Sequence, residues 1–133
     1  MMRYCFLICL VSFFAMTCKT NTLQTTPPVK PNALLLNTWV NENEKDELNA
    51  IHYRPATYTL PRSRGRKSMR FDEDGTVIIQ DIAPSCGLES NEGKWTMLPN
   101  GHLALSFPQK PSKNDTIAII SITNDLLIIN PLP

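Results

Sequence analysis

The sequence holds few of the residues from which most active sites are built. It has only two histidines, His52 and His102, and neither has a metal-binding partner two to five residues away. Its five glycines are scattered, so no glycine-rich phosphate loop is present. No pair of carboxylates or nucleophile with a base stands out as a catalytic set. We therefore expect a protein that is not an enzyme, with no catalytic residue, no metal and no cofactor.

The sequence also lacks an excess of charge. The net charge is +1, and without Arg3 twelve basic residues balance twelve acidic ones. This balance argues against nucleic acid as a partner. Residues 61–70 contain five basic residues, which could bind anionic head groups or polymers. The acidic residues at 72–74 and 42–47 could equally balance them as a solvated loop.

No hydrophobic run is long enough to span a bilayer. Residues 4–14 are eleven uncharged, mostly apolar residues, whereas a membrane helix needs about 20. With Arg3 before them, they predict a signal peptide over residues 1–17. The following Ala15-Met16-Thr17-Cys18 resembles a bacterial lipobox, with Ala15 and Thr17 departing from the usual residues. The resemblance implies a lipid on Cys18 and membrane attachment through it, and otherwise plain secretion.

Cysteine is scarce in the region expected to fold. Cys5 and Cys9 belong to the predicted signal peptide, and Cys18 would carry the lipid. Cys86 then remains alone, so the folded region has no disulfide framework. We interpret Cys86 as an ordinary loop thiol, because no histidine or basic residue adjoins it in sequence. The residues after Cys18 do not resemble the acidic surface-export signal of Bacteroidetes-type lipoproteins, which implies an outer-membrane lipoprotein that faces the periplasm.

The rest of the chain divides into a tether and one domain. Residues 18–33 begin with Cys18 and contain three prolines, four threonines and few apolar side chains to bury. This composition predicts a tether. Residues 34–133 form short apolar runs separated by turn residues, without a lasting helical period. Residues 53–60, interrupted by Pro55, predict an irregular or edge strand.

Three hairpins can be predicted in this domain. They join residues 67–71 to 76–82, residues 94–98 to 102–107, and residues 116–122 to 126–130. Together with the earlier runs they give about eight short strands. The pattern predicts an all-β domain, a small antiparallel up-and-down β-barrel or half-barrel.

Three short motifs suggest a family. They are Leu36-Asn37-Thr38-Trp39, the Phe71 hairpin that turns at Asp74-Gly75, and Gly93-Lys94-Trp95. In this order the chain resembles the lipocalin-like domain of bacterial, Bacteroidetes-type lipoproteins, although Asn37 stands where that family usually has glycine. The resemblance implies a lipocalin-like barrel in the cell envelope, and a barrel mouth that could bind a small hydrophobic or amphipathic ligand.

The candidate site residues follow from this fold. Trp39 and Trp95 are expected to be structural, in the core or plugging one end of the barrel. Tyr53 and Tyr58 lie near a loop and are candidates for the barrel mouth, with Arg70 as a further ligand-binding candidate. A carrier would have an open apolar cavity ringed by Tyr58 and arginines. The alternative is a protein-interaction module, such as an inhibitor of a lytic enzyme or an assembly partner. It would have a filled barrel and a projecting loop at 83–92 or 108–114, and its partner cannot be named from the sequence.

Overall fold

The computed structural model of the chain describes residues 32–132. The predicted signal peptide, the lipid-anchor Cys18 and nearly all of the tether lie outside the described residues. The described part contains three short 3-10 helices, η1 (Ala33–Leu35), η2 (Asn43–Lys45) and η3 (Pro111–Lys113). Its eight strands are β1 (Thr38–Asn41), β2 (Ile51–Pro55), β3 (Ser68–Phe71), β4 (Thr76–Ile82), β5 (Leu88–Met97), β6 (His102–Ser106), β7 (Asp115–Ile122) and β8 (Leu127–Leu132).

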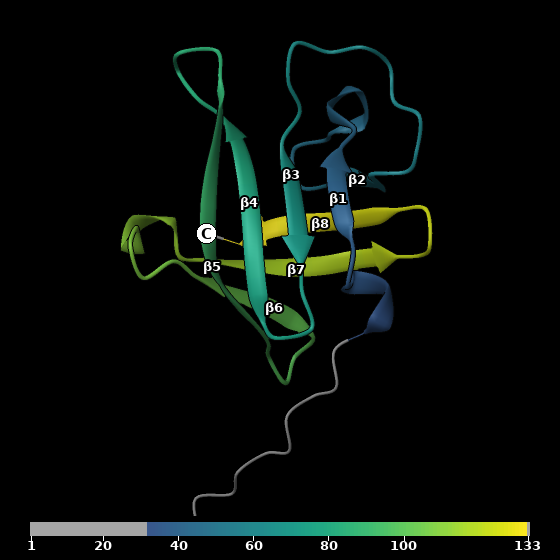
Figure 1. Cartoon of the computed structure of the whole chain (residues 1–133). Helices are drawn as coiled ribbons and strands as arrows, with labels where there is room; N and C mark the ends of the chain where they lie inside the picture. The colour runs from purple at the N-terminus through teal and green to yellow at the C-terminus, as the bar shows by residue number, and fades with distance from the viewer. Residues whose placement is uncertain (1–31, 133) are drawn as a thin grey trace, which may run out of the picture.

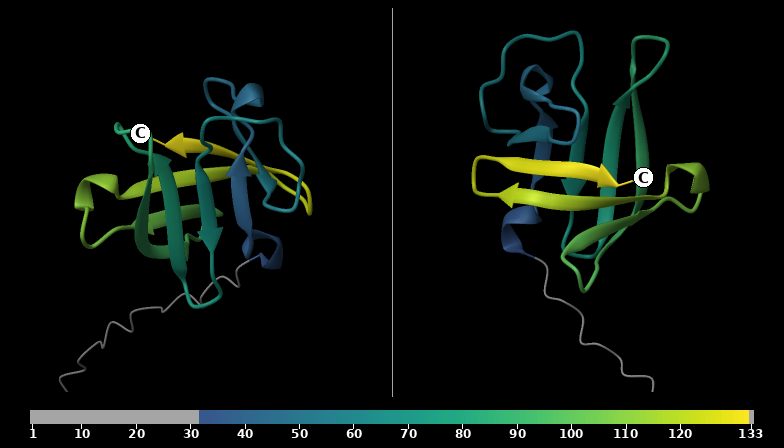
Figure 2. Two further views of the ribbon diagram at one scale, coloured as in Figure 1. Left: turned by 45° about the horizontal axis from the view of Figure 1, so that its top comes forward. Right: turned by 180° about the vertical axis from the view of Figure 1, so that it is seen from behind.

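The strands close into one antiparallel barrel. Their order around the barrel is β1-β2-β8-β7-β6-β5-β4-β3, and β3 pairs with β1 to complete the circle. Figure 1 and the two views of Figure 2 show β7 and β8 crossing the direction of β3, β4 and β5. The predicted all-β class and small antiparallel barrel of about eight short strands are confirmed. The three predicted hairpins are also confirmed, as β3–β4, β5–β6 and β7–β8.

Two of these hairpins turn on a glycine with positive φ. Gly75 has a φ of 79° and Gly101 a φ of 81°. An L-residue with a side chain rarely adopts this conformation, so the Asp-Gly and Asn-Gly pairs position these turns. At the first turn, the Asp74 carboxylate also accepts a hydrogen bond of 2.8 Å from the Thr76 N–H. The turn residues thereby fix the register of the strands on either side.

The strand order departs from a simple up-and-down circuit at one place. β1 lies between β2 and β3, so the connection 56–67 must pass β1 to join two strands that run in the same direction. The simple order holds from β3 to β8. The predicted irregular or edge strand at 53–60 is a strand only as far as Pro55, where β2 ends. β8 pairs with β2 as far as Tyr53, β1 pairs with it as far as Pro55, and residues 56–60 form no strand. Pro55 is tolerated because its nitrogen faces the β8 side, where pairing has already ended at Tyr53.

The prediction of a loop over 83–92 is also wrong in its second half. The turn ends at Gly87. β5 begins at Leu88 and pairs with β4 from Leu88 to Lys94. The β4–β5 hairpin does project beyond the other strands, as Figure 1 shows. Cys86 lies in its turn as an exposed free thiol with a φ of 64°.

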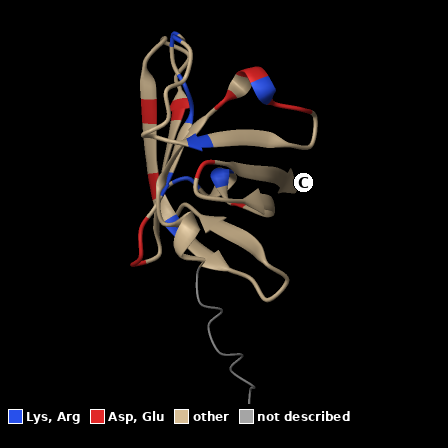
Figure 3. Ribbon diagram, turned by 90° about the vertical axis from the view of Figure 1, so that its right-hand side faces the viewer, with Lys and Arg blue, Asp and Glu red and all other residues tan. Residues whose placement is uncertain are grey.

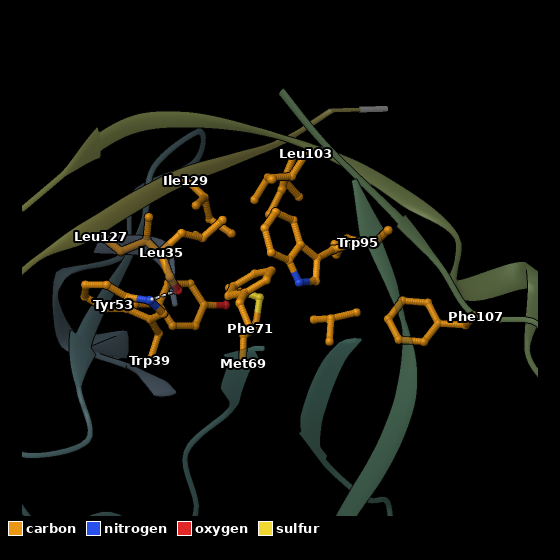
Figure 4. Close-up of a cluster of buried hydrophobic side chains, with 13 residues drawn as sticks. Leu35, Trp39, Tyr53, Met69, Phe71, Trp95, Leu103, Phe107, Leu127 and Ile129 are labelled. Carbon is orange, nitrogen blue, oxygen red and sulfur yellow. Dashed lines mark hydrogen bonds between the residues drawn. The ribbon is translucent and has the colours of Figure 1, made fainter. Parts of the chain in front are cut away.

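The lower part of the barrel is filled with apolar side chains. Figure 4 shows this core, in which Trp39, Leu35 and Leu127 are fully buried. The Trp39 indole Nε1–H donates to the Leu35 carbonyl at 3.1 Å, which fixes η1 beneath the barrel. The Trp95 indole meets the Phe71 ring edge-on with centroids 5.8 Å apart. We call this the closed end.

The opposite end carries the loops that precede β2, β5 and β7. β1, β4, β6 and β8 run toward this end, and the other four strands run away from it. The inward-facing positions here hold polar as well as apolar side chains. We call it the open end, and it lies opposite the point at which the described chain begins at Asn32 (Figure 1).

Candidate functional site

The open end contains a cavity among the inner faces of β4 to β7. Its volume is about 270 Å³. It is lined by Ile79, Asp81, Asn91, Leu105, Phe107, Lys113 and Asp115. We call it the mouth cavity. Its walls combine an apolar side, formed by Ile79, Leu105 and Phe107, with polar and charged groups, as small-molecule sites do.

A second hollow lies next to it, at the wall of the barrel. β5 pairs with β6 only from Lys94 to Met97, so the strands separate above Lys94. The hollow between them has a volume of about 460 Å³ and is lined by Ser90 to Lys94 on one side and Phe107 to Lys110 on the other. We call it the edge groove. Asn91 and Phe107 border both hollows.

Gly93 makes this arrangement possible. A Cβ atom built at Gly93 would lie 2.4 Å from the Ser106 carbonyl oxygen and 2.6 Å from the Phe107 ring. Only glycine therefore lets the Phe107 ring pack directly against β5, where it separates the mouth cavity from the edge groove. Phe107 itself is 2% exposed, and its N–H donates to the Asn114 side chain at 2.7 Å.

Asn91 is the polar group that stands out in the mouth cavity. It is 6% exposed, and its Nδ2 amide has no hydrogen-bond partner among residues 32–132. Asn41 is equally buried, but its Nδ2 donates to the Asp46 carboxylate and to the His52 carbonyl. An unsatisfied buried amide destabilises a fold by about 1–3 kcal/mol. Nδ2 itself is buried from solvent, so a hydrogen-bond acceptor supplied by a ligand would bond to it once the Asn91 side chain turns toward the cavity.

Most of the charged groups around the mouth cavity are paired, but the Asp115 carboxylate forms no ion pair with a described residue. The Asp81 carboxylate meets Lys67 Nζ at 3.3 Å and Lys113 Nζ at 3.2 Å. Lys110 on the β6–β7 loop pairs with Glu89 on β5. Partial burial raises the pKa of Asp81, but the hydrogen bonds and charges of the two lysines outweigh it and hold that pKa below its usual range. The cavity lining therefore carries one exposed carboxylate, Asp115, that is unpaired within residues 32–132, beside the paired Asp81 and Lys113.

Lys113→Met is expected to raise the pKa of Asp81, because it removes one of the two cations that stabilise the carboxylate. The wild-type pKa is lower folded than unfolded. Its contribution to stability is therefore complete above the unfolded pKa of about 4 and is lost as the pH falls through the folded value. Carboxyl NMR titration measures the shift directly. Lys45→Met in η2 is the control, and an equal Asp81 pKa in both variants would contradict the assignment.

The predicted ligand-binding residues do not come together at one site. Tyr53 points into the core and is 5% exposed, and burial, with Asp46 and Asp81 nearby, raises its pKa. Tyr58 lies in the connection after β2, with the Arg54 guanidinium 4.7 Å from the centre of its ring. Arg70 is on the outer face of β3 and pairs with Asp72 at 3.1 Å. The two predicted structural tryptophans, Trp39 and Trp95, both lie in the core.

The basic run is spread over the molecule as well. The Arg66 guanidinium is held by the Glu44 carboxylate, Asn43 and the Asn41 and Pro61 carbonyls, and the Arg66 hydrogen bond lowers the pKa of Glu44 to about 2. Lys67 and Arg70 pair with acids at different places. Figure 3 shows basic and acidic residues interspersed along the ribbon. The described part of the run therefore does not form one continuous cationic surface.

Comparison with known proteins gives no relative from which a function could be transferred. No family model matches the chain, and neither the curated proteins nor the solved structures contain a match. Within residues 32–132, no three His, Cys, Asp or Glu side chains are grouped so that they could hold a metal ion. No helix in that part of the chain has the length and apolarity to cross a bilayer.

Proposed function

We propose that this protein is a non-enzymatic lipoprotein of the cell envelope whose barrel binds a small amphipathic molecule in the mouth cavity. The observation that carries the proposal is the buried Asn91 amide, which lines the cavity and has no partner among the described residues. The ligand would place an acceptor oxygen against Asn91 and an apolar segment against Ile79, Leu105 and Phe107. The lipocalin-like resemblance of the sequence supports the same use of the barrel.

The chemistry of the cavity narrows the ligand further. Lys113 and Asp81 are engaged with each other, so an anionic ligand would have to disrupt the Asp81 ion pairs and would also meet the unpaired Asp115 carboxylate. A neutral molecule with a carbonyl or hydroxyl oxygen would satisfy Asn91 without that loss. A cavity of about 270 Å³ also limits the bound part to a small group or a short chain.

The envelope location is the second part of the proposal. It rests on the signal-like residues 1–17 and on Cys18, which would carry the lipid. The described chain begins beside η1 at the closed end, so the tether would enter the barrel at the end opposite the mouth cavity. In this arrangement the cavity is available to ligands while the protein is anchored.

Asn91→Leu tests the binding site through two opposite effects. It replaces an unsatisfied amide with an apolar group of similar size, so we expect the free energy of unfolding to rise by about 1 kcal/mol. The same change should weaken binding of 2-hexanone, a neutral probe with one carbonyl, at least about tenfold. Urea unfolding of the full chain measures the first effect. NMR titration of both proteins with 2-hexanone, followed at the backbone amides that line the cavity, measures the second, and the wild-type Asn91 side-chain amide reports the contact itself.

The structure offers a matched control. Asn41→Leu removes an equally buried but fully bonded amide, and should lower the free energy of unfolding by about 2 kcal/mol. Hexane, which has no oxygen, should leave the Asn91 amide signals unshifted. The proposal fails if Asn91→Leu destabilises the protein as Asn41→Leu does, or if the variant binds 2-hexanone as well as the wild type.

A further inference from the structure

The upper half of β5 has a free edge. β5 pairs with β4 from Leu88 to Lys94, but on its other side β6 pairs with it only from Lys94 onward. The Trp95 N–H donates to the Gly75 carbonyl on the β4 side. Because strand residues alternate in direction, the N–H and C=O groups of Ser90 and Glu92 point the other way. No described residue forms a hydrogen bond with those four groups.

The sequence explains why β6 does not cover this edge. In the β5–β6 register Lys94 faces Ser106, so a longer β6 would place Pro108 opposite Glu92. Proline has no N–H to donate to the ladder. The chain instead turns away after Phe107, and the loop to β7 is closed by the Phe107–Asn114 hydrogen bond. The edge groove is therefore a gap in the barrel wall beside unused backbone donors and acceptors.

The outer face of the hairpin adds side chains that a partner could use. Leu88 and its cross-strand neighbour Ile82 are 57% and 51% exposed, an unusual pair of apolar side chains at a projecting tip. Glu92, four residues along the same face, forms no ion pair within residues 32–132. An unpaired sheet edge of this kind is a template for an added strand.

We infer that the free edge of β5 binds an extended segment of another protein, which adds a strand to the barrel wall at the edge groove. In an antiparallel arrangement the segment would carry a basic residue opposite Glu92 and, four residues later, an apolar residue opposite Leu88. This partner surface is the backbone edge of β5 on the barrel wall, and it adjoins the interior binding site proposed above, since Asn91 and Phe107 border both hollows.

A second copy of the chain suits this edge poorly. A two-fold pairing centred on Glu92 would bring two glutamates together. A pairing centred on Ser90 would set Leu88 opposite Glu92, and one centred on Asn91 would set Leu88 opposite Lys94. Each of these three self-pairings, which use the free edge around Ser90 to Glu92, opposes like charges or leaves an apolar side chain against a charged one, so a different chain is the better occupant.

The test uses a seven-residue peptide with blocked ends, Lys at its second position, Val at its sixth and Thr elsewhere. With the full chain labelled for NMR, we expect the peptide to slow amide hydrogen exchange of Ser90 and Glu92 at least about tenfold. The amides of Asn91 and Gly93 face β4 and should change little. N-methylation of the fourth peptide residue, whose N–H would face Ser90, should abolish the protection, whereas N-methylation of the third should not.

Charge reversal provides a further check that does not depend on the backbone. Glu92→Lys on the exposed face should favour a peptide with Glu at its second position over the one with Lys. The inference is overturned if no β5 amide gains protection, or if the two N-methyl peptides behave alike. It is also overturned if Ser90 and Glu92 are already protected without peptide in a concentration-dependent way, which would identify a second copy as the occupant.

Discussion

Trp39→Ala is expected to lower the free energy of unfolding by about 5 kcal/mol. The side chain is fully buried, and removing a buried Trp typically costs about 3–5 kcal/mol. The change also leaves the Leu35 carbonyl without the indole N–H that now bonds to it at 3.1 Å. Since a domain of this size is stable by about 5–15 kcal/mol in total, we expect most of its stability to be lost.

Chemical denaturation of the full chain would measure this loss. Leu48→Ala provides the comparison, because Leu48 is a large apolar residue that is 96% exposed, and its removal should change the stability by less than about 0.5 kcal/mol. Equal effects of the two substitutions would mean that Trp39 does not close the barrel in the way described. A Trp39→Phe variant should retain part of the packing but lose the hydrogen bond.

Gly93→Ala is expected to destabilise the protein by about 3 kcal/mol, although it adds only one methyl group. The new Cβ would lie 2.4 Å from a backbone oxygen and 2.6 Å from the Phe107 ring, so strand β6 or the ring would have to move. Because Phe107 lines the mouth cavity, we expect displacement of its ring to change the shape of that cavity. Thermal unfolding measures the stability, and chemical shifts of Phe107 report the movement.

Gly87→Ala is the matched control for this effect. A Cβ at Gly87, in the β4–β5 turn, would meet no atom within 4 Å, and its φ is not positive. We therefore expect a stability change between zero and a gain of about 1 kcal/mol. If Gly87→Ala and Gly93→Ala behave alike, the close packing of Phe107 on β5 is not a determinant of stability.

Much of the fold follows from local patterns in the sequence. The alternation in residues 102–107 and 116–122 predicts half-buried strands. Asp74-Gly75 predicts the turn from β3 to β4, and Asn100-Gly101 the turn from β5 to β6. The upper part of β5 was not predicted because its inner face carries Asn91 and Gly93 rather than apolar residues. The position of β1 between β2 and β3 could not be predicted either, because it depends on pairing between distant segments.

The candidate site was harder to predict than the fold. Tyr53 and Tyr58 were chosen because they are amphipathic residues near a loop, but one is buried in the core and the other lies beneath Arg54 on the surface. Asn91 stands in a polar stretch that looks like a loop. The sequence nevertheless indicates that Asn91 faces the barrel interior, because Asn91 is four residues before the buried Trp95 and so lies on the same side of the strand.

The pairing of β2 with β8 has a consequence for how the barrel is made. This seam joins Ile51 to Ile129, whereas the neighbouring pairs from β3 to β8 are all formed between consecutive strands. During synthesis β1 and β2 are made first. β8, the second pairing partner of β2, is made only after β3 to β7. The β1–β2 hairpin therefore has one side unpaired until β8 is present, and closure of the described barrel depends on β8.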